Sequence, residues 1–139
     1  MKKLLLLIFA LTLVLCLASC GGNVDSSALW GSAVYTKDTA LGQGEKTFVL
    51  EVKIEDKTVT LTVNTDADTV GKALIDNGII EGEDGPYGLY IKKVNGVLAD
   101  YDVDQSYWSF YIDGQYAMSG VDTTEITEDA VYSLVYTKE

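Results

Sequence analysis

The pattern of apolar and polar positions divides the chain into an apolar start, a polar stretch and an alternating remainder. Nearly every residue from 4 to 15 is apolar. Small and polar residues dominate from 21 to about 46, which is typical of flexible linkers. From Thr47 on, apolar residues recur at every second position, the period of half-buried strands. The pattern predicts one folded domain over residues 47–139, preceded by a flexible tether over residues 20–46.

The domain begins with two predicted strands and a tight turn between them. Residues 47–54 alternate between apolar and polar side chains, and residues 58–63 do the same. The short segment Glu55-Asp56-Lys57 separates them. Because so short a connection joins only neighbouring strands that run in opposite directions, the pattern predicts an antiparallel hairpin.

The period then changes from that of a strand to that of a helix. Val70, Ala73 and Leu74 are spaced as neighbours on one helix face. Asp68 or Thr69 can cap its N-terminus, and Gly78 suits the left-handed conformation that ends many helices. The pattern predicts one short helix, followed by an acidic, glycine-rich loop over residues 81–85.

The second half of the domain alternates again. We predict strands over residues 89–94 and 107–112, closed by the turn signals Asn95-Gly96 and Asp113-Gly114. Residues 115–118 return as a short partner. The last strand, residues 130–137, carries bulky side chains on both faces, which favours a central position. The whole order predicts an α+β fold, a β-grasp (ubiquitin-like) mixed sheet of about five strands with one helix across one face.

The apolar start has the features of a signal peptide. Met1-Lys2-Lys3 is basic, and the apolar run is shorter than the roughly 20 residues that span a membrane. Leu17-Ala18-Ser19-Cys20 resembles the bacterial lipobox, in which the cysteine is lipidated. The resemblance implies a lipoprotein signal peptide over residues 1–19 and a lipid anchor on Cys20. The mature chain would then lie on the extracytoplasmic face of the bacterial cell membrane. An ordinary secretory signal cut near Ala18 is the alternative.

The charge and the amino-acid composition limit the functions that we expect of the mature chain. Without Lys2 and Lys3 the formal net charge changes from -11 to -13, so the mature chain repels nucleic acid. The chain has no histidine, and its two cysteines are Cys16, in the signal peptide, and Cys20. Because histidine and thiol chemistry are absent from the mature domain, we expect no enzyme, no catalytic residue and no cofactor.

Two acidic segments have the alternating oxygen side chains of a calcium loop. These are residues 64–68 and 100–104. Neither has the glycine and glutamate that an EF-hand requires further along. We predict a helix cap for the first segment and a solvated loop for the second, and expect no metal site. An irregular calcium site over residues 100–104 is the alternative.

Aromatic side chains are the densest chemical feature. Eight lie between residues 87 and 116. Alternation in the strand 107–112 places Trp108, Phe110 and Ile112 on one face, which we expect to be the core. Tyr107 and Tyr111 then lie on the other face. Because such rings offer a flat apolar face with a polar handle, they suit planar ligands or partner proteins. The candidate ligand-binding residues are Tyr87, Tyr107, Trp108, Tyr111, Tyr116 and Met118.

Three stretches together carry a family resemblance. They are Tyr87-Gly88-Leu89-Tyr90-Ile91, Val94-Asn95-Gly96 and the strand 107–112 with its turn Asp113-Gly114. Residues 47–139 resemble the C-terminal β-grasp domain of the transcobalamin and intrinsic-factor family. In that family the domain closes over one face of cobalamin, and an α-helical barrel that has no counterpart here holds the other face.

The resemblance implies a binding module for cobalamin, a related corrinoid or another small planar ligand. With no histidine to coordinate cobalt, stacking and hydrogen bonds would hold a corrinoid. The alternative is a protein-interaction or cell-surface assembly module without a small-molecule ligand. A third hypothesis is an accessory partner of a membrane transporter.

Overall fold

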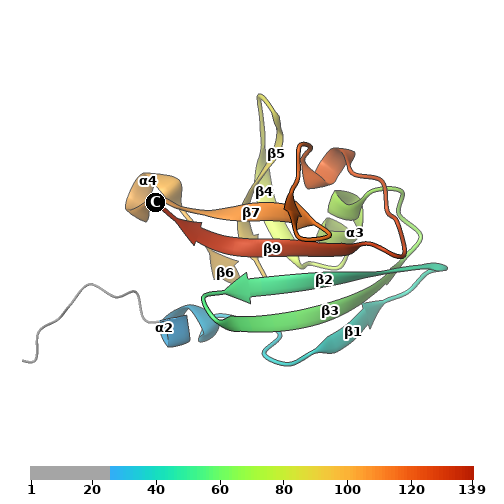
Figure 1. Ribbon diagram of the computed structural model, residues 1–139, viewed down its shortest axis with the longest axis horizontal. Coiled ribbons are helices and arrows are strands. Elements are labelled where there is room, and N and C mark those ends of the chain that lie inside the picture. Colours follow the sequence, from blue (N-terminus) through green and yellow to red (C-terminus); the bar gives the residue numbers. More distant parts are fainter. Residues whose placement is uncertain (1–25) are drawn as a thin grey trace, which may run out of the picture.

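The computed structural model describes residues 26–139. The predicted signal peptide over residues 1–19, the lipidated Cys20 and the start of the tether lie outside the described residues. Within the described part, no helix is both long and apolar enough to cross a membrane. Most of the regular secondary structure of this part consists of strands, which are arranged in two sheets (Figure 1).

The larger sheet has six strands in the order β1-β3-β2-β9-β7-β8. It is mixed, because β1 runs parallel to β3 and β2 runs parallel to β9, while the other pairs are antiparallel. The predicted central position of the last strand is confirmed, since β9 lies between β2 and β7. The strands are β1 (Thr39–Gly42), β2 (Lys46–Ile54), β3 (Lys57–Thr65), β7 (Ser106–Ile112), β8 (Gln115–Tyr116) and β9 (Val131–Lys138).

The smaller sheet has three strands, β4 (Ile80–Gly85), β5 (Gly88–Val94) and β6 (Val97–Leu98). Its β4–β5 hairpin stands up from the larger sheet (Figure 1). The prediction of a loop over residues 81–85 is therefore wrong. Backbone pairing with β5 makes this segment a strand, and ion pairs from Lys92 to Glu83 (3.4 Å) and from Lys93 to Glu81 (3.3 Å) offset its acidic character.

The predicted helix is α3 (Val70–Asp76), with Thr69 as its N-cap. The Thr69 side chain accepts a hydrogen bond from the backbone N–H of Lys72 (3.3 Å), and Gly78 has the expected positive φ of 68°. Three shorter helical segments were not predicted: α2 (Ser26–Trp30), α4 (Tyr101–Asp104) and the 3₁₀ turn η1 (Val121–Thr123).

The core lies between the larger sheet and the layer formed by α3 and the smaller sheet. The apolar side chains predicted to face inward from β2 and β3 have exposed fractions of 0–1%. At the centre, the ring of Tyr132 meets Phe48 edge to face at 5.5 Å and stacks on Phe110 at 6.0 Å. Rings from three neighbouring strands of the larger sheet, β2, β9 and β7, therefore pack together at the centre of the core.

The expected tether is folded from residue 26 on. Trp30 is buried, and the Lys57 ammonium lies 4.7 Å from its ring centroid. Asn95 holds the backbone at Tyr35 in place. Its side chain accepts a hydrogen bond from the Tyr35 N–H and donates one to the Tyr35 carbonyl, both at 2.8 Å. β1 then extends the larger sheet. Burial of one indole and pairing of one strand thus extend the folded part of the chain to before Thr47.

The predicted α+β class is confirmed, but the strand number is not. The six-stranded sheet and the second, three-stranded sheet exceed the five strands expected. The unpredicted strands come from segments interpreted as tether (β1) and loop (β4), together with the two-residue strand β6, whereas the short partner predicted within residues 115–118 is confirmed as β8. Backbone pairing rather than side-chain alternation makes these segments strands, so the hydrophobic pattern does not reveal them.

Candidate ligand-binding groove

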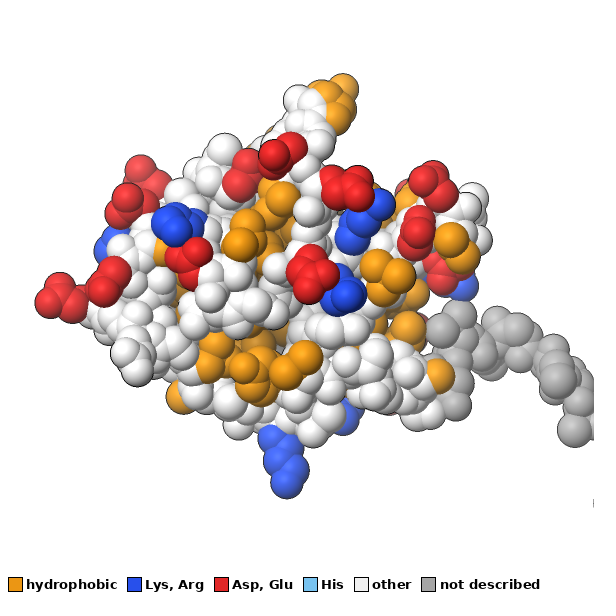
Figure 2. All heavy atoms as spheres, turned by 180° about the vertical axis from the view of Figure 1, so that it is seen from behind, with side chains coloured by type: hydrophobic (Ala, Val, Ile, Leu, Met, Phe, Trp, Pro, Cys, Tyr) orange, Lys and Arg blue, Asp and Glu red, His pale blue; other side chains and the backbone are white. Residues whose placement is uncertain are grey.

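A groove of about 450 Å³ lies between the β4–β5 hairpin and the segment that leads from β8 to η1. β7 forms its floor. Seen from behind, the hairpin tip is an apolar projection at the top of the molecule, and apolar side chains occupy hollows between acidic ones (Figure 2). The lining residues are Tyr87, Leu89, Tyr90, Ile91, Tyr107, Trp108, Phe110, Tyr116, Ala117, Met118, Ser119, Gly120 and Val121.

The groove brings together five of the six candidate residues, from three separate segments. Tyr87 comes from the hairpin tip, Tyr107 and Trp108 from β7, and Tyr116 and Met118 from the opposite wall. Tyr111 does not line the groove. It is the cross-strand partner of Tyr116, and their rings meet edge to face with centroids 5.7 Å apart. Tyr111 therefore supports a groove residue.

The floor of the groove belongs to the core. Trp108 is only 7% exposed, and its indole N–H donates to the Val97 carbonyl at 3.2 Å. Its ring also meets Tyr136 edge to face at 5.5 Å. The prediction that Trp108 and Phe110 face the core is confirmed, because both are buried. A ligand in the groove would reach only the small exposed part of the indole.

The side chains at the rim of the groove are exposed, unlike those of its floor. Tyr87 and Met118 are each 98% exposed, and Tyr116 is 65% exposed. Large apolar side chains that contact so little of the protein add little to its stability. They can instead fold over a flat ligand or a partner surface, and the tyrosines add hydroxyl groups that exchange hydrogen bonds.

Hydrogen bonds hold the wall from Ala117 to Val121 in place. The Ala117 N–H donates to the Phe110 carbonyl at 3.0 Å, which fixes the wall to the floor. The Thr124 hydroxyl donates to the Gly120 carbonyl at 2.8 Å. The groove is therefore bounded by backbone that is anchored on both sides, although its rim side chains are exposed.

Two glycines allow the hairpin and the wall to approach Asp122. A Cβ atom at Gly88 would lie 3.0 Å from the Asp122 carboxylate, and one at Gly120 would lie 2.6 Å from it. Gly88 also has a φ of 105°, which favours glycine. Oδ1 of Asp122 is buried and has no hydrogen-bond partner among the described residues. This carboxylate lies directly behind the groove wall.

Hydrogen bonds within the protein engage part of each acidic segment. Asp66 accepts from the Glu45 N–H at 2.9 Å, and Asp68 pairs with Lys46 at 3.3 Å. Thr69, rather than Asp68, caps the helix. Asp100 caps α4 by accepting from the Asp102 N–H at 3.1 Å. Over residues 26–139, no three acidic, cysteine or histidine side chains are grouped so that they could hold a metal ion.

Sequence reasoning missed the inner side of the groove. Leu89 and Ile91 line it from the hairpin, and Ser119 to Val121 line it from the wall. The alternation of residues 89–94 gives the side on which Leu89 and Ile91 lie. No sequence pattern shows that this face meets the wall after β8, because that contact depends on how the hairpin stands on the sheet.

Comparison with known proteins defines the fold class. A chain from Ruminococcus gnavus ATCC 29149, described as a candidate metal-binding protein, is 27% identical, with a TM-score of 0.63. The match covers 68% of this chain and 99% of that one. Haptocorrin in complex with Cbi is 18% identical with a TM-score of 0.51, and the match covers 67% of this chain and 25% of haptocorrin. The haptocorrin match supports the predicted family resemblance at the level of the fold.

Residues 67–131 match the family model described as Domain of unknown function (DUF4430). This stretch contains the β4–β5 hairpin, β7 and the wall of the groove. No curated protein matches the chain. The chain is thus similar to a domain whose function its family description leaves open.

Proposed function

We propose that this protein is an extracytoplasmic binding module of the β-grasp type whose groove receives one face of a small planar ligand. A corrinoid such as cobalamin is the ligand that we favour. The observation that carries the proposal is the assembly of seven aromatic or thioether side chains from three segments around one groove. No catalytic step is part of the proposal.

The dimensions and lining of the groove support a small-molecule ligand. Ligand sites are typically concave, about 300–1,000 Å³ in volume and lined mainly by apolar and aromatic side chains. The groove, at about 450 Å³, falls in this range. The structural likeness to haptocorrin, solved with Cbi, favours a corrinoid among planar ligands. Because the groove is open, it would cover one face and leave the other to solvent or to a second protein.

Calorimetric titration of the full chain, purified in a non-ionic detergent, with cobalamin and with cobinamide tests the proposal. We expect saturable heat and a change in the corrin absorbance. Tyr116→Ala and Met118→Ala should each weaken binding, because they remove rim contacts. Val34→Ala is the matched control, since Val34 is 66% exposed and does not line the groove. Absence of heat and of any spectral change at high micromolar ligand would overturn the corrinoid assignment.

The exposed rim favours a second candidate, a protein-interaction or surface-assembly module. Tyr87, at 98% exposed, sits on a hairpin that projects from the domain. Such a projection can insert an aromatic anchor into a pocket of a partner. A transporter subunit is one class of partner. If this candidate holds, Tyr87→Ala should abolish crosslinking to a membrane protein in intact cells, and corrinoids should not compete.

We also propose that a lipid on Cys20 anchors the protein to the outer face of the cell membrane. The proposal rests on the lipobox resemblance of Leu17-Ala18-Ser19-Cys20. Two acyl chains on one cysteine would give a stable anchor, since a single chain holds only marginally. Cys20→Ala should release the protein or leave an unprocessed precursor. Membrane retention of a fully processed Cys20→Ala chain would contradict the anchor.

A further inference from the structure

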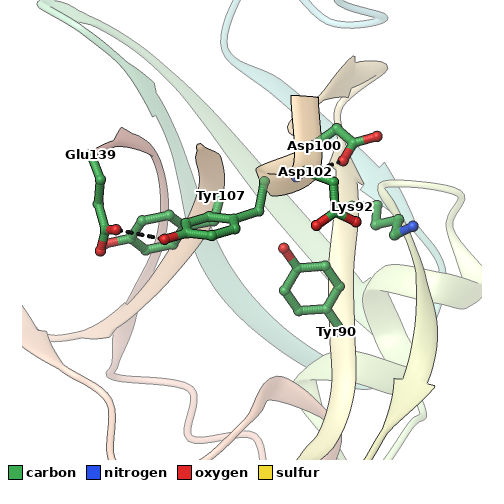
Figure 3. Close-up of a pocket in the computed structure, with 7 residues that line it drawn as sticks. Tyr90, Lys92, Asp100, Asp102, Tyr107 and Glu139 are labelled. Carbon is green, nitrogen blue, oxygen red and sulfur yellow. Dashed lines mark hydrogen bonds between the residues drawn. The ribbon is translucent and has the colours of Figure 1, made fainter. Parts of the chain in front are cut away.

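A second hollow, of about 500 Å³, lies beside the start of β7, next to the groove. It is bounded by β5, by α4 and by the end of the chain after β9 (Figure 3). Tyr90 and Tyr107 line both this hollow and the groove, so the two adjoin. The other lining residues are a third tyrosine, Tyr101, and four charged side chains that the groove does not have: Lys92, Asp100, Asp102 and Glu139.

Three tyrosine rings form the aromatic part of this hollow. The rings of Tyr101 and Tyr107 have centroids 6.4 Å apart and planes inclined by 59°, so they form a corner. Tyr90 approaches from β5, on the side away from Glu139 (Figure 3). Tyr90 and Tyr101 are each 42% exposed. Their faces are therefore accessible to a ligand.

Carboxylates surround these rings. Glu139 accepts a hydrogen bond from the Tyr101 hydroxyl at 2.8 Å, and Asp100 is engaged as the cap of α4. Asp102 is exposed, and Figure 3 shows its carboxylate near the hydroxyl of Tyr90. The one cation in the lining, Lys92, pairs with Glu83 at 3.4 Å. The hollow thus presents net negative charge beside open aromatic faces.

α4 is short, but it is firmly attached at this position. The fully buried hydroxyl of Ser106 accepts from the Asp100 N–H at 3.1 Å and donates to the Asp104 carboxylate. The Glu139 N–H donates to the Gln105 carbonyl at 3.2 Å. These bonds connect both sides of the hollow to the turn between α4 and β7, so the backbone of α4 and of Glu139 is held in place before any ligand arrives.

We propose that this hollow binds an organic ammonium ion that carries apolar substituents, such as a quaternary ammonium. Aromatic faces attract such a cation through their quadrupole, and nearby carboxylates add charge attraction. An anion would be repelled by the same carboxylates. The bare divalent cations that proteins bind need a closer set of oxygen ligands than the described residues provide. The inference does not depend on what the neighbouring groove binds.

The test is titration of the full chain, in a non-ionic detergent, with tetramethylammonium and with choline. The control ligand is the neutral isostere of choline in which carbon replaces the nitrogen. We expect both cations to bind and the isostere to bind at least about fivefold more weakly, because it lacks the charge. Phosphocholine should also bind more weakly than choline, since its phosphate meets the carboxylates. Equal binding of choline and its neutral isostere would overturn the proposal.

Choline titration of substituted chains tests whether the cation binds in this hollow. Tyr101→Ala and Asp102→Asn should each weaken choline binding about fivefold, and Lys92→Gln should strengthen it, because the competing cation is gone. Asp129→Asn is the matched control, an exposed carboxylate that does not line the hollow. Asp102→Asn should leave corrinoid binding unchanged, and Met118→Ala should leave choline binding unchanged. If Asp129→Asn weakens choline binding as much as Asp102→Asn does, general charge rather than this hollow attracts the cation, and the proposal fails.

Discussion

The two adjoining hollows beside β7 share that strand and two tyrosines, Tyr90 and Tyr107, yet they differ in what surrounds them. The groove has a floor of core side chains and a rim that touches almost nothing. The hollow beside α4 is surrounded by carboxylates that hydrogen bonds keep in place. Because β7 alternates, adjacent residues such as Tyr107 and Trp108 serve the surface and the core. The flanking segments, rather than β7, therefore determine the chemistry of each hollow.

The largest effect should come from the floor of the groove. Trp108→Ala should lower the free energy of unfolding by about 3–5 kcal/mol, because it empties a core position and removes the hydrogen bond to Val97. Tyr87→Ala, on the rim, should change it by less than about 0.5 kcal/mol. Urea denaturation followed by tryptophan or far-ultraviolet signals measures both. A Trp108→Ala chain that is as stable as the wild type would show that the floor is not part of the core.

The next effect tests how closely the wall must approach the Asp122 carboxylate. Gly120→Ala should destabilise the fold by about 1–3 kcal/mol, because its Cβ would lie 2.6 Å from the Asp122 carboxylate. Asp122→Ala in the same chain should recover part of that loss, since it removes the contact. The double mutant cycle, measured by urea denaturation, gives the coupling. Additive effects of the two changes would argue against the contact.

The regions that the sequence predicts best are those in which local period and burial agree. β2 and β3 were predicted because apolar residues occupy every second position, and α3 because they recur every three to four positions. In all three elements the apolar residues face the same core. β4 was missed because Glu81-Gly82-Glu83 has no apolar alternation and is a strand through pairing with β5. The packing of Trp30 was missed because it depends on a tertiary contact.

How far each hollow could be predicted from the sequence depends on how close its lining residues are along the chain. The aromatic density between residues 87 and 116 indicates the groove, since most of its rings are close in sequence. Among the six candidate residues, only Tyr111 does not line the groove. The hollow beside α4 depends on Glu139 meeting Tyr101 across 38 positions. Its acidic segment was interpreted as a solvated loop, because nothing local shows which rings it would meet.

A smaller effect should follow from detaching α4. Ser106→Ala removes the hydroxyl that joins Asp100 and Asp104, so it should cost about 1 kcal/mol of stability. As a positioning residue, Ser106 should also support choline binding, which should weaken in the variant, while corrinoid binding at the groove should not change. Ser109→Ala is a control on the same strand, because Ser109 bonds to Thr137 and lines neither hollow. If both variants lose choline binding equally, Ser106 has no specific role in positioning the choline site.

The Ser106 hydroxyl also affects how the stability of the fold depends on pH in the acid range. The hydrogen bond from Ser106 holds the pKa of the Asp104 carboxyl below its usual value. A carboxyl whose pKa is lower in the folded state stabilises the fold above its ordinary pKa, and this contribution is lost as pH falls through the folded value. Ser106→Ala should therefore raise the pKa of Asp104 and flatten the decline in stability on acidification. Carboxyl chemical shifts followed through an acid titration would detect this, and an unchanged Asp104 pKa would rule it out.

The smallest effect concerns Tyr101, whose pKa is raised because Glu139 accepts its hydrogen bond and its negative charge disfavours the phenolate. The neutral phenol, and with it the bond to Glu139, persists below the ordinary pKa of tyrosine and is lost as pH rises through the folded value. Glu139→Gln should lower the pKa of Tyr101 toward its ordinary value, as phenolate absorbance would show. Because both side chains are exposed, stability should hardly change. The same variant removes one carboxylate from the hollow, so choline binding should weaken below the phenol transition as well. A lowered Tyr101 pKa with unchanged choline affinity would leave Asp102 and the rings as the groups that attract the cation, which would sharpen the contrast with the uncharged groove.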